Sequence, residues 1–217
     1  MNPILQETHM TEKLSNPLND SQQVELVTPD EIDTVAQVLA EAYAEDPIHA
    51  WSMPKEDTRH NDAVTFFSFF LKRMQIHRWE VYATIDRSAV AVMATVLQKD
   101  TEYRESVRYM PQLIRTLSPA SEYIRWIETF RPALDHRYLE FIGSLPSKQS
   151  HGKGSLLLRA IIEMSNKEKL PVWTWSSNSR NLTFYKRLGF QIDKKLSLDA
   201  DPPPVTTLWR PIMPFDD

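Results

Sequence analysis

Glycine is scarce in this 217-residue chain, and its placement constrains the fold more than any other feature. Of the four glycines, Gly143, Gly152 and Gly154 fall within twelve residues, around the junction of an apolar segment at 138–144 with a helical pattern at 152–168. Because glycine costs backbone entropy, this clustering indicates positive φ angles or a close approach of the backbone to another group. The free N–H groups of the following helix would face the loop, so the junction predicts an anion-binding site.

Hydrophobic periodicity predicts strands and helices that alternate along the rest of the chain. Thr28, Pro29 and Glu31 form the signature of a capping box at the start of a helix that Pro47 is expected to end. We expect strands at 22–27, 79–85, 89–97, 138–144, 172–176, 190–196 and 205–212. We expect helices at 28–47, 57–79, 103–130 (in two pieces), 152–168 and 180–188. This order predicts a single α/β domain over residues 22–217, built around a mixed sheet.

Composition narrows the class of function. The net charge of −4 carries no basic field that would indicate nucleic acid. The chain has no cysteine, and its six histidines show no metal-binding spacing, so we expect no metal and no thiolate nucleophile. No apolar run is long enough for a membrane span. We expect residues 1–21 to be a disordered tail without signal-peptide character, and the protein to be cytoplasmic.

Three phosphate-binding patterns compete for the glycine loop. A P-loop would need a glycine where Ser147 stands and a hydroxyl where Gly154 stands. A dinucleotide fingerprint would need a third glycine and a strand immediately before the loop, and both are missing. The pattern Gln-x-x-Gly-x-Gly, formed by Gln149, Gly152 and Gly154, fits without such gaps.

A second segment gives this pattern its context. In "WTWSSNSRNLTFYKRLGFQI" a predicted strand is followed by Asn178 and Asn181, and then by a helix that ends in Tyr185-x-x-x-Gly189-Phe190. Together the two segments resemble the GNAT (N-acetyltransferase) superfamily, most strongly over residues 137–197. The resemblance implies a mostly antiparallel central sheet flanked by helices, here with an extra helical pair before the fourth strand. It also implies acetyl-CoA as cosubstrate.

The resemblance also assigns roles to residues. Tyr185 is expected to be the general acid toward the CoA sulfur, and Glu140 is a candidate general base, with Asp46 and Glu80 as weaker alternatives. The strand at 138–144 is expected to splay from the strand at 172–176. The residues expected to bind the cofactor are Ile142, Gly143, Ser144, Leu145, Gln149, Ser150, His151, Gly152, Lys153, Gly154, Asn178, Asn181 and Tyr185.

The acceptor is less constrained by the sequence. Aromatic residues after the first helix and within the second predict a substrate pocket that includes Tyr43, Trp51 and Phe70, although such spacing is also typical of a core. We expect N-acetylation of a small-molecule primary amine by direct attack in a ternary complex. The alternative is a catalytically silent acyl-CoA-binding or regulatory module. The mostly apolar strand at 205–212 is a candidate for pairing with a second copy in a homodimer.

Overall fold

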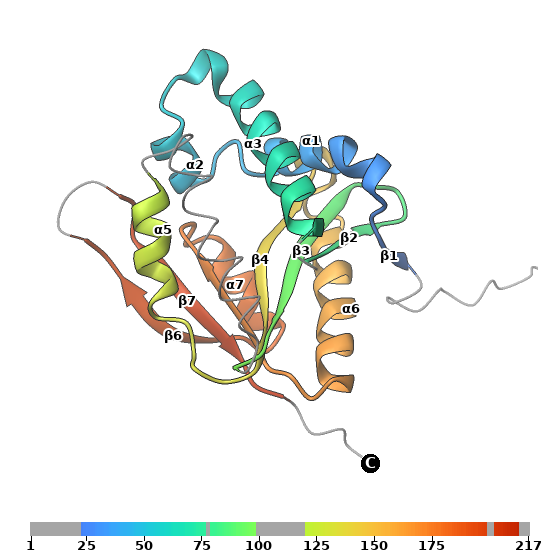
Figure 1. The fold of residues 1–217 in the computed structure, drawn as a ribbon, viewed down its shortest axis with the longest axis vertical. Helices are drawn as coiled ribbons and strands as arrows, with labels where there is room; N and C mark the ends of the chain where they lie inside the picture. Colours follow the sequence, from blue (N-terminus) through green and yellow to red (C-terminus); the bar gives the residue numbers. More distant parts are fainter. Residues whose placement is uncertain (1–22, 77–78, 99–119, 199–201, 213–217) are drawn as a thin grey trace, which may run out of the picture.

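The structure is a computed structural model that describes residues 23–76, 79–98, 120–198 and 202–212 (Figure 1). The strands are β1 (Val24–Leu26), β2 (Glu80–Thr84), β3 (Ala89–Val96), β4 (His136–Ser144), β5 (Val172–Ser176), β6 (Gln191–Leu196) and β7 (Val205–Arg210). The helices are α1 (Ile32–Ala42), α2 (Pro47–Ser52), α3 (Glu56–Ile76), α5 (Ala120–Glu128), α6 (Lys153–Lys167) and α7 (Asn181–Arg187). Short 3-10 turns lie at Pro29–Glu31 and Pro146–Lys148.

The strands form one sheet in the order β1-β2-β3-β4-β5-β7-β6. All neighbouring strands are antiparallel except β4 and β5, which run parallel. The predicted mixed, mostly antiparallel sheet is therefore confirmed. The prediction that the strand at 205–212 is available for a second copy is wrong, because β7 lies between β5 and β6 and both of its edges are paired.

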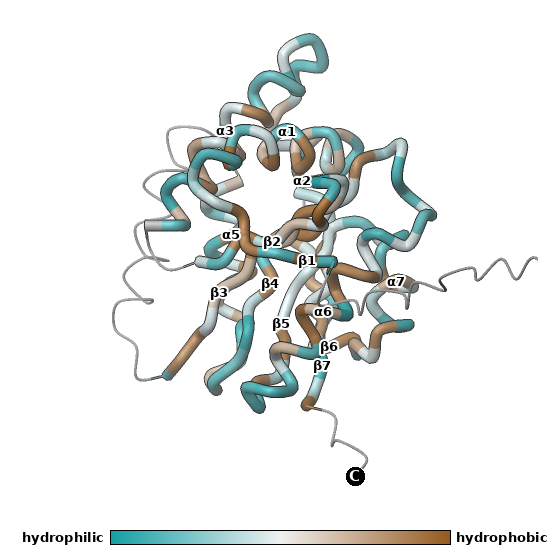
Figure 2. Tube along the Cα trace, turned by 90° about the vertical axis from the view of Figure 1, so that its right-hand side faces the viewer, coloured by the Kyte–Doolittle hydropathy of each residue, from teal (hydrophilic) through white to brown (hydrophobic). Residues whose placement is uncertain are grey.

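Helices cover both faces of the sheet, and each face has its own apolar core (Figure 1). On one face α1, α3 and α5 pack against the strands and bury, among others, Val35, Leu39, Phe67, Phe70, Ile127 and Phe141. On the other face α6 and α7 bury Leu157, Leu158, Ile161, Tyr185 and Leu139. Figure 2 shows hydrophobic residues concentrated where the helices meet the sheet. Burial of this apolar surface is the main force that holds the layers together.

One extra residue in β4 shifts the pattern of inward and outward side chains. Val92 pairs with Phe141 and Met93 pairs with Leu139, so Glu140 is the bulged residue between them. Because of this bulge, Tyr138 and Phe141 both face the core under α1 and α3. In a regular strand, residues three apart would face opposite sides of the sheet.

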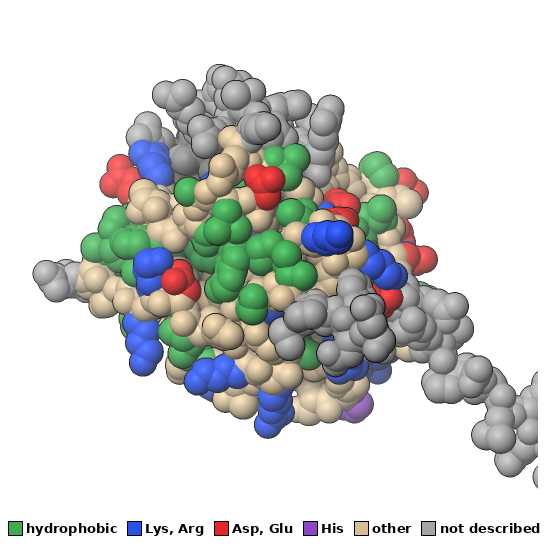
Figure 3. Space-filling view, turned by 90° about the horizontal axis from the view of Figure 1, so that it is seen from below, with side chains coloured by type: hydrophobic (Ala, Val, Ile, Leu, Met, Phe, Trp, Pro, Cys, Tyr) green, Lys and Arg blue, Asp and Glu red, His purple; other side chains and the backbone are tan. Residues whose placement is uncertain are grey.

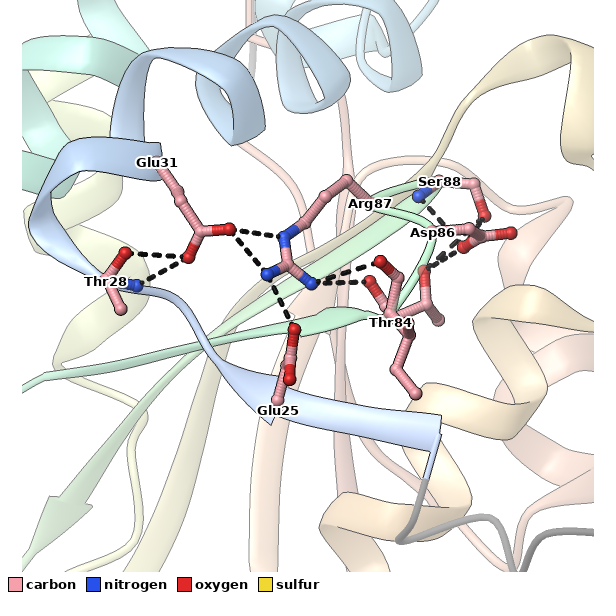
Figure 4. A network of polar contacts seen from close by, with 8 residues as sticks. Glu25, Thr28, Glu31, Thr84, Asp86, Arg87 and Ser88 are labelled. Carbon is pink, nitrogen blue, oxygen red and sulfur yellow. Dashed lines mark hydrogen bonds and ion pairs between the residues drawn. The ribbon is translucent and has the colours of Figure 1, made fainter.

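A polar network fixes the β2–β3 turn to the start of the helical layer (Figure 4). Arg87 at the turn has φ 53°, and its guanidinium pairs with Glu31 and Glu25. Glu31 accepts hydrogen bonds from the Thr28 N–H (3.0 Å) and hydroxyl (2.8 Å), as the capping box predicts. The bond from the Thr28 N–H, followed by that from Arg87, lowers the pKa of Glu31 to about 2.

The sequence predictions and the structure differ near Pro47. The first helix ends at Ala42, and Pro47 begins a second helix, α2, in place of ending the first. Asp46 caps this helix and accepts the N–H of Ile48 at 3.0 Å. The second piece of the predicted helical pair is α5. The first piece, and the tail at 1–21, lie outside the described residues.

One face of the molecule carries an exposed group of hydrophobic side chains. Figure 3, seen from below, shows hydrophobic side chains in the middle of one face, with Lys and Arg side chains around them. No helix in the described ranges is long and apolar enough to cross a lipid bilayer.

Candidate active site

β4 and β5 run side by side only near their starts. Their parallel pairing joins Arg137 to Val172 and Tyr138 to Trp173 and then ends, although both strands continue. The predicted splay of these strands is therefore confirmed. The Leu145 N–H bonds to the Ser88 carbonyl of the β2–β3 turn (2.9 Å). Because such bonds alternate along an antiparallel pair, residues 142 and 144 direct their backbone groups away from β3, into the opening beside β5.

The hydroxyl of Tyr43 reaches into this opening. It accepts a hydrogen bond from the Ile142 N–H (3.2 Å) and donates one to the Ile142 carbonyl (3.3 Å). Gly143 allows α1 to lie this close, because a Cβ at residue 143 would stand 2.6 Å from the Cβ of Ala42. Burial raises the pKa of Tyr43 well above its usual value, so the hydroxyl keeps its proton and remains a donor.

The glycine loop leads into the N-terminus of α6. Gly152 caps the helix with φ 76°, in the region that favours glycine. The first helical bond runs from the Leu156 N–H to the Gly152 carbonyl (2.8 Å), so the amides of Lys153, Gly154 and Ser155 precede the helical ladder. These amides and the positive end of the helix dipole favour an anion at this point.

The predicted loop residues Gln149 and His151 form hydrogen bonds within the loop itself. The Gln149 and His151 N–H groups donate to the Pro146 and Lys148 carbonyls, both at 3.3 Å. The His151 ring stays near its own loop, with Nδ1 2.8 Å from the Gln149 carbonyl oxygen. Gln149, Ser150 and His151 are exposed.

Lys153 turns away from the loop toward the β2–β3 turn. Its Nζ pairs with Asp86 Oδ2 at 2.7 Å. Burial acts to raise the pKa of Asp86, but hydrogen bonds from Lys153, Ser88 and Thr84 outweigh it and hold that pKa well below its usual value. This ion pair anchors the start of α6 to the network shown in Figure 4.

A cleft with an empty volume of about 740 Å³, part of it open to solvent, lies where β4 and β5 diverge. It is bounded by α2, α3, α5 and α7. Its lining residues are Tyr43, Asp46, Ile48, His49, Ser52, Met53, Phe66, Ala120, Ile124, Glu140, Phe141, Trp175, Ser176, Ser177, Asn181 and Tyr185.

Glu140 of β4 and Tyr185 of α7 both line this cleft. Burial, followed by the nearby Glu128 carboxylate, raises the pKa of Glu140 to about 8. Its Oε2 is buried and has no hydrogen-bond partner in the part of the chain that the structure describes. Burial also raises the pKa of Tyr185 above its usual value, so the phenol is protonated at neutral pH. The cleft therefore holds one group able to accept a proton near pH 8 and one able to donate a proton.

Glu128 of α5 forms a buried polar cluster with Glu140. Glu128 pairs with Arg131 (2.8 Å) and accepts a hydrogen bond from the Tyr138 hydroxyl (2.8 Å). That hydroxyl in turn accepts a hydrogen bond from the Trp175 Nε1–H (3.1 Å). Burial raises the pKa of Glu128 as well. The ion pair with Arg131 favours the charge on Glu128, so Glu140 is the member of the pair that holds the proton.

Comparison with known proteins agrees with this geometry. Residues 115–190 match the sequence model of the acetyltransferase (GNAT) family. The resemblance to the GNAT superfamily is confirmed. Acetyltransferases of this family use acetyl-CoA, so the match supports acetyltransferase activity in general.

Solved structures with similar folds include three acetyltransferases. A histone acetyltransferase HPA2 and related acetyltransferase from Corynebacterium glutamicum superimposes with a TM-score of 0.66 at 22% identity, covering 89% of this chain and 98% of that one. The ribosomal-protein-S18-alanine N-acetyltransferase from Escherichia coli gives 0.52 at 15% identity, covering 89% and 96%. Arylalkylamine N-acetyltransferase 2 from Aedes aegypti gives 0.54 at 12% identity, covering 88% and 98%. At these identities the likeness establishes the GNAT fold.

The two predicted asparagines of the GNAT-like segment have different surroundings. Asn178 organises the turn before α7, since its Oδ1 accepts the Arg180 N–H (3.1 Å) and its carbonyl accepts the Asn181 N–H (3.0 Å). Asn181, the first residue of α7, lines the cleft. The structure thus brings only Asn181 to the cleft itself.

Of the predicted substrate residues, only some line the cleft. Tyr43 lines the cleft, whereas Trp51 does not and contacts Tyr123 of α5, with ring centroids 6.0 Å apart. Phe70 is only 2% exposed and packs in the core, and Phe66, one helical turn earlier, takes the place at the cleft that was expected of Phe70.

Sequence reasoning gave Asp46 only as a weaker candidate base, and it did not place His49 or Ser177 in the cleft. Asp46 accepts hydrogen bonds from Ser177 Oγ at 2.9 Å, which ties the start of α2 to the loop after β5. Burial raises the pKa of Asp46 and lowers that of His49 to about 4. The Asp-Pro dipeptide at 46–47 was the sequence signal for a helix start here. Within the described residues, no cluster of His, Asp and Glu could hold a metal ion.

Proposed function

We propose that this protein transfers the acetyl group of acetyl-CoA to the primary amine of a small molecule, by direct attack in a ternary complex. The observation that carries the proposal is that Glu140 and Tyr185 line one cleft at the divergence of β4 and β5. Amide formation from a thioester needs a base for the amine and an acid for the thiolate, and the cleft supplies both. Because the chain has no cysteine, it cannot form an acyl-thiol intermediate.

Acetyl-CoA has two candidate contacts in the backbone. In this proposal the amides of residues 153–155 bind the pyrophosphate at the start of α6. The pantetheine arm enters the opening between β4 and β5, where Ile142 and Ser144 present N–H and carbonyl groups. Asn181 and Tyr185 then lie on the α7 side of the thioester.

The proposed reaction balances its protons. In its deprotonated form, which becomes populated near pH 8, Glu140 takes one proton from the ammonium, and the free amine nitrogen attacks the thioester carbon. When the carbon–sulfur bond breaks, Tyr185 donates its proton to the thiolate, and the second proton lost from the nitrogen restores the phenol. The products are the N-acetyl amide, free CoA thiol and one proton, which Glu140 releases to water.

The test measures thiol release from acetyl-CoA with DTNB across a panel of primary amines. We expect Tyr185→Phe to reduce kcat by about 100-fold, a typical contribution of a general acid, with the acetyl-CoA KM nearly unchanged. Tyr82→Phe is the matched control, because Tyr82 is also buried but lies outside the cleft, with its hydroxyl on Glu80 (3.1 Å). An unchanged kcat in Tyr185→Phe would remove Tyr185 from the mechanism.

A silent acyl-CoA-binding module is the alternative outcome. Thermal stabilisation by acetyl-CoA without thiol release for any amine would favour it over the enzyme. A donor with a longer acyl chain is tested in the same assay by competition among CoA thioesters. The cytoplasmic location expected from the sequence stays a prediction.

A further inference from the structure

We infer that the acceptor is a monoamine on an apolar aliphatic or aromatic body, and that polyamines and peptide N-termini are poor substrates. This inference rests on the proposed function and names the substrate class of the same cleft. It depends on three properties of the lining: its apolar walls, the internal satisfaction of its polar groups, and the sign of its charge.

The walls of the cleft are largely apolar. Helix α2 and the residue after it contribute Ile48 and Met53, and α3 contributes Phe66. Helix α5 contributes Ala120 and Ile124, and the strands contribute Phe141 and Trp175. The aromatic side chains are held by ring contacts, with Phe66 5.2 Å from Phe67 between ring centroids. Walls of this kind favour a ligand whose body is itself apolar.

Most polar groups of the lining already bond to the protein. Ser52 Oγ donates to the His49 carbonyl (3.3 Å), and Ser176 Oγ donates to the Asn178 carbonyl (3.2 Å). Ser177 Oγ donates to Asp46, and Trp175 uses its single donor on the Tyr138 hydroxyl. A peptide would bring its own amides into the cleft, and amides that are buried without partners lose affinity.

The lining contains acidic side chains and no basic ones. Among the described lining residues the ionisable acids are Asp46 and Glu140, and there is no lysine or arginine. His49 is neutral at pH 7 because burial lowers its pKa to about 4. Once Glu140 has lost its proton, near pH 8, one ammonium fits beside its carboxylate, whose Oε2 has no hydrogen-bond partner among the described residues. A second ammonium farther along would meet the apolar walls, where an unpaired charge is costly.

The experiment compares amines that differ in one property. We would measure kcat/KM for butylamine, hexylamine and 2-phenylethylamine, for 1,6-diaminohexane, which adds only a second ammonium to hexylamine, and for an alanine tripeptide. We expect kcat/KM to rise about threefold to fivefold per added CH₂, and hexylamine to exceed the diamine by about tenfold or more. Preference for the diamine or the peptide would overturn the inference.

A pair of variants on α5 tests the walls. Ile124→Asn places an amide in the cleft, and we expect it to lower kcat/KM for hexylamine by about tenfold and to shrink the gap to the diamine. Arg125→Asn is the control, because Arg125 is exposed on the same helix and does not line the cleft. Equal effects of the two variants, or unchanged selectivity in Ile124→Asn, would contradict the inference.

Binding separates this inference from the proposed function. If no amine is acetylated, the proposed function fails, and calorimetry with acetyl-CoA-saturated protein still ranks hexylamine against 1,6-diaminohexane. Tighter binding of hexylamine would keep the inference as a statement about the ligand. Equal or weaker binding of hexylamine would reject it.

Discussion

Among the individual side chains, Glu140 and Glu128 make the clearest prediction. The groups that face Glu140 are Glu128 and Arg131 on the α5 side and Tyr138 on β4. We expect kcat/KM to rise with pH through an apparent pKa of about 8. In Glu140→Gln we expect this rising limb of the pH profile to be absent. Glu128→Gln removes the like charge that raises the pKa of Glu140, so we expect this rise in kcat/KM to move down by about one pH unit.

The pH profile of Glu128→Gln also separates electrostatics from folding. Glu122→Gln is the control, because Glu122 is exposed on the same helix. A loss of activity at every pH without a shift of the limb would indicate that Glu128 acts on stability alone. A shift to higher pH would contradict the proposed charge on Glu128.

Tyr43 makes a second prediction, about the cosubstrate. Its hydroxyl bonds to both backbone groups of Ile142, which the proposed pantetheine arm would use. Tyr43→Phe keeps the ring between Phe67 and Phe141 but removes the competing hydroxyl. We expect acetyl-CoA to bind about threefold to tenfold more tightly, the equivalent of one hydrogen bond, as measured by calorimetry. Weaker binding would mean that the hydroxyl itself contacts the ligand.

Among the secondary-structure elements, the packing of α1 on β4 depends on Gly143. An alanine Cβ would meet the Cβ of Ala42 at 2.6 Å, and neither atom belongs to a flexible side chain. We expect Gly143→Ala to cost about 1–3 kcal/mol, as overpacking does, which lowers Tm by about 2–4 °C per kcal/mol. Gly154→Ala is the matched control, since its Cβ would lie 3.9 Å from Phe184 and it adds helix propensity. Equal Tm values for the two variants would contradict this account of Gly143.

The helices and strands also show how much of the fold could be predicted from the sequence. Local patterns predicted most strands and helices, and two motifs predicted the loop before α6 and the position of Tyr185. Pro47 was misread because a proline that ends one helix can equally begin the next, and Asp46 decides between them. The place of β7 between β5 and β6 depends on sheet order, which residue periodicity does not encode.

Contacts between side chains far apart in the sequence could not be predicted from local patterns either. Lys153 could not be assigned to Asp86 from local sequence, because the ion pair exists only after the β2–β3 turn meets α6. Helical spacing placed Phe66 and Phe70 on one face of α3, but which of them reaches the cleft depends on the packing of the neighbouring elements. The bulge that frees Glu140 from regular pairing likewise arises between two strands.

Across the protein as a whole, buried ionisable groups make stability depend on pH in opposing directions. Burial lowers the pKa values of His49 and His136 to about 4, so the unfolded chain binds these protons more readily below pH 6.5. Each histidine therefore removes stability as pH falls from about 6.5 toward 4. The raised pKa of Glu140 acts the other way, because folding favours its protonated form, and it removes stability as pH rises from about 4.5 through 8.

Substitution of one buried histidine measures how much that residue contributes to the pH dependence of stability. His136 is fully buried and has ring contacts with Trp173 and Trp209, and its Nε2 has no hydrogen-bond partner among the residues described. In urea unfolding at pH 7, 6 and 5, we expect the wild type to lose about 2 kcal/mol relative to His136→Gln between pH 7 and 5. His60 is exposed, so the free energy of unfolding of His60→Gln should change with pH in parallel with that of the wild type. Parallel curves for His136→Gln would mean that His136 binds its proton equally well in the folded and unfolded chain.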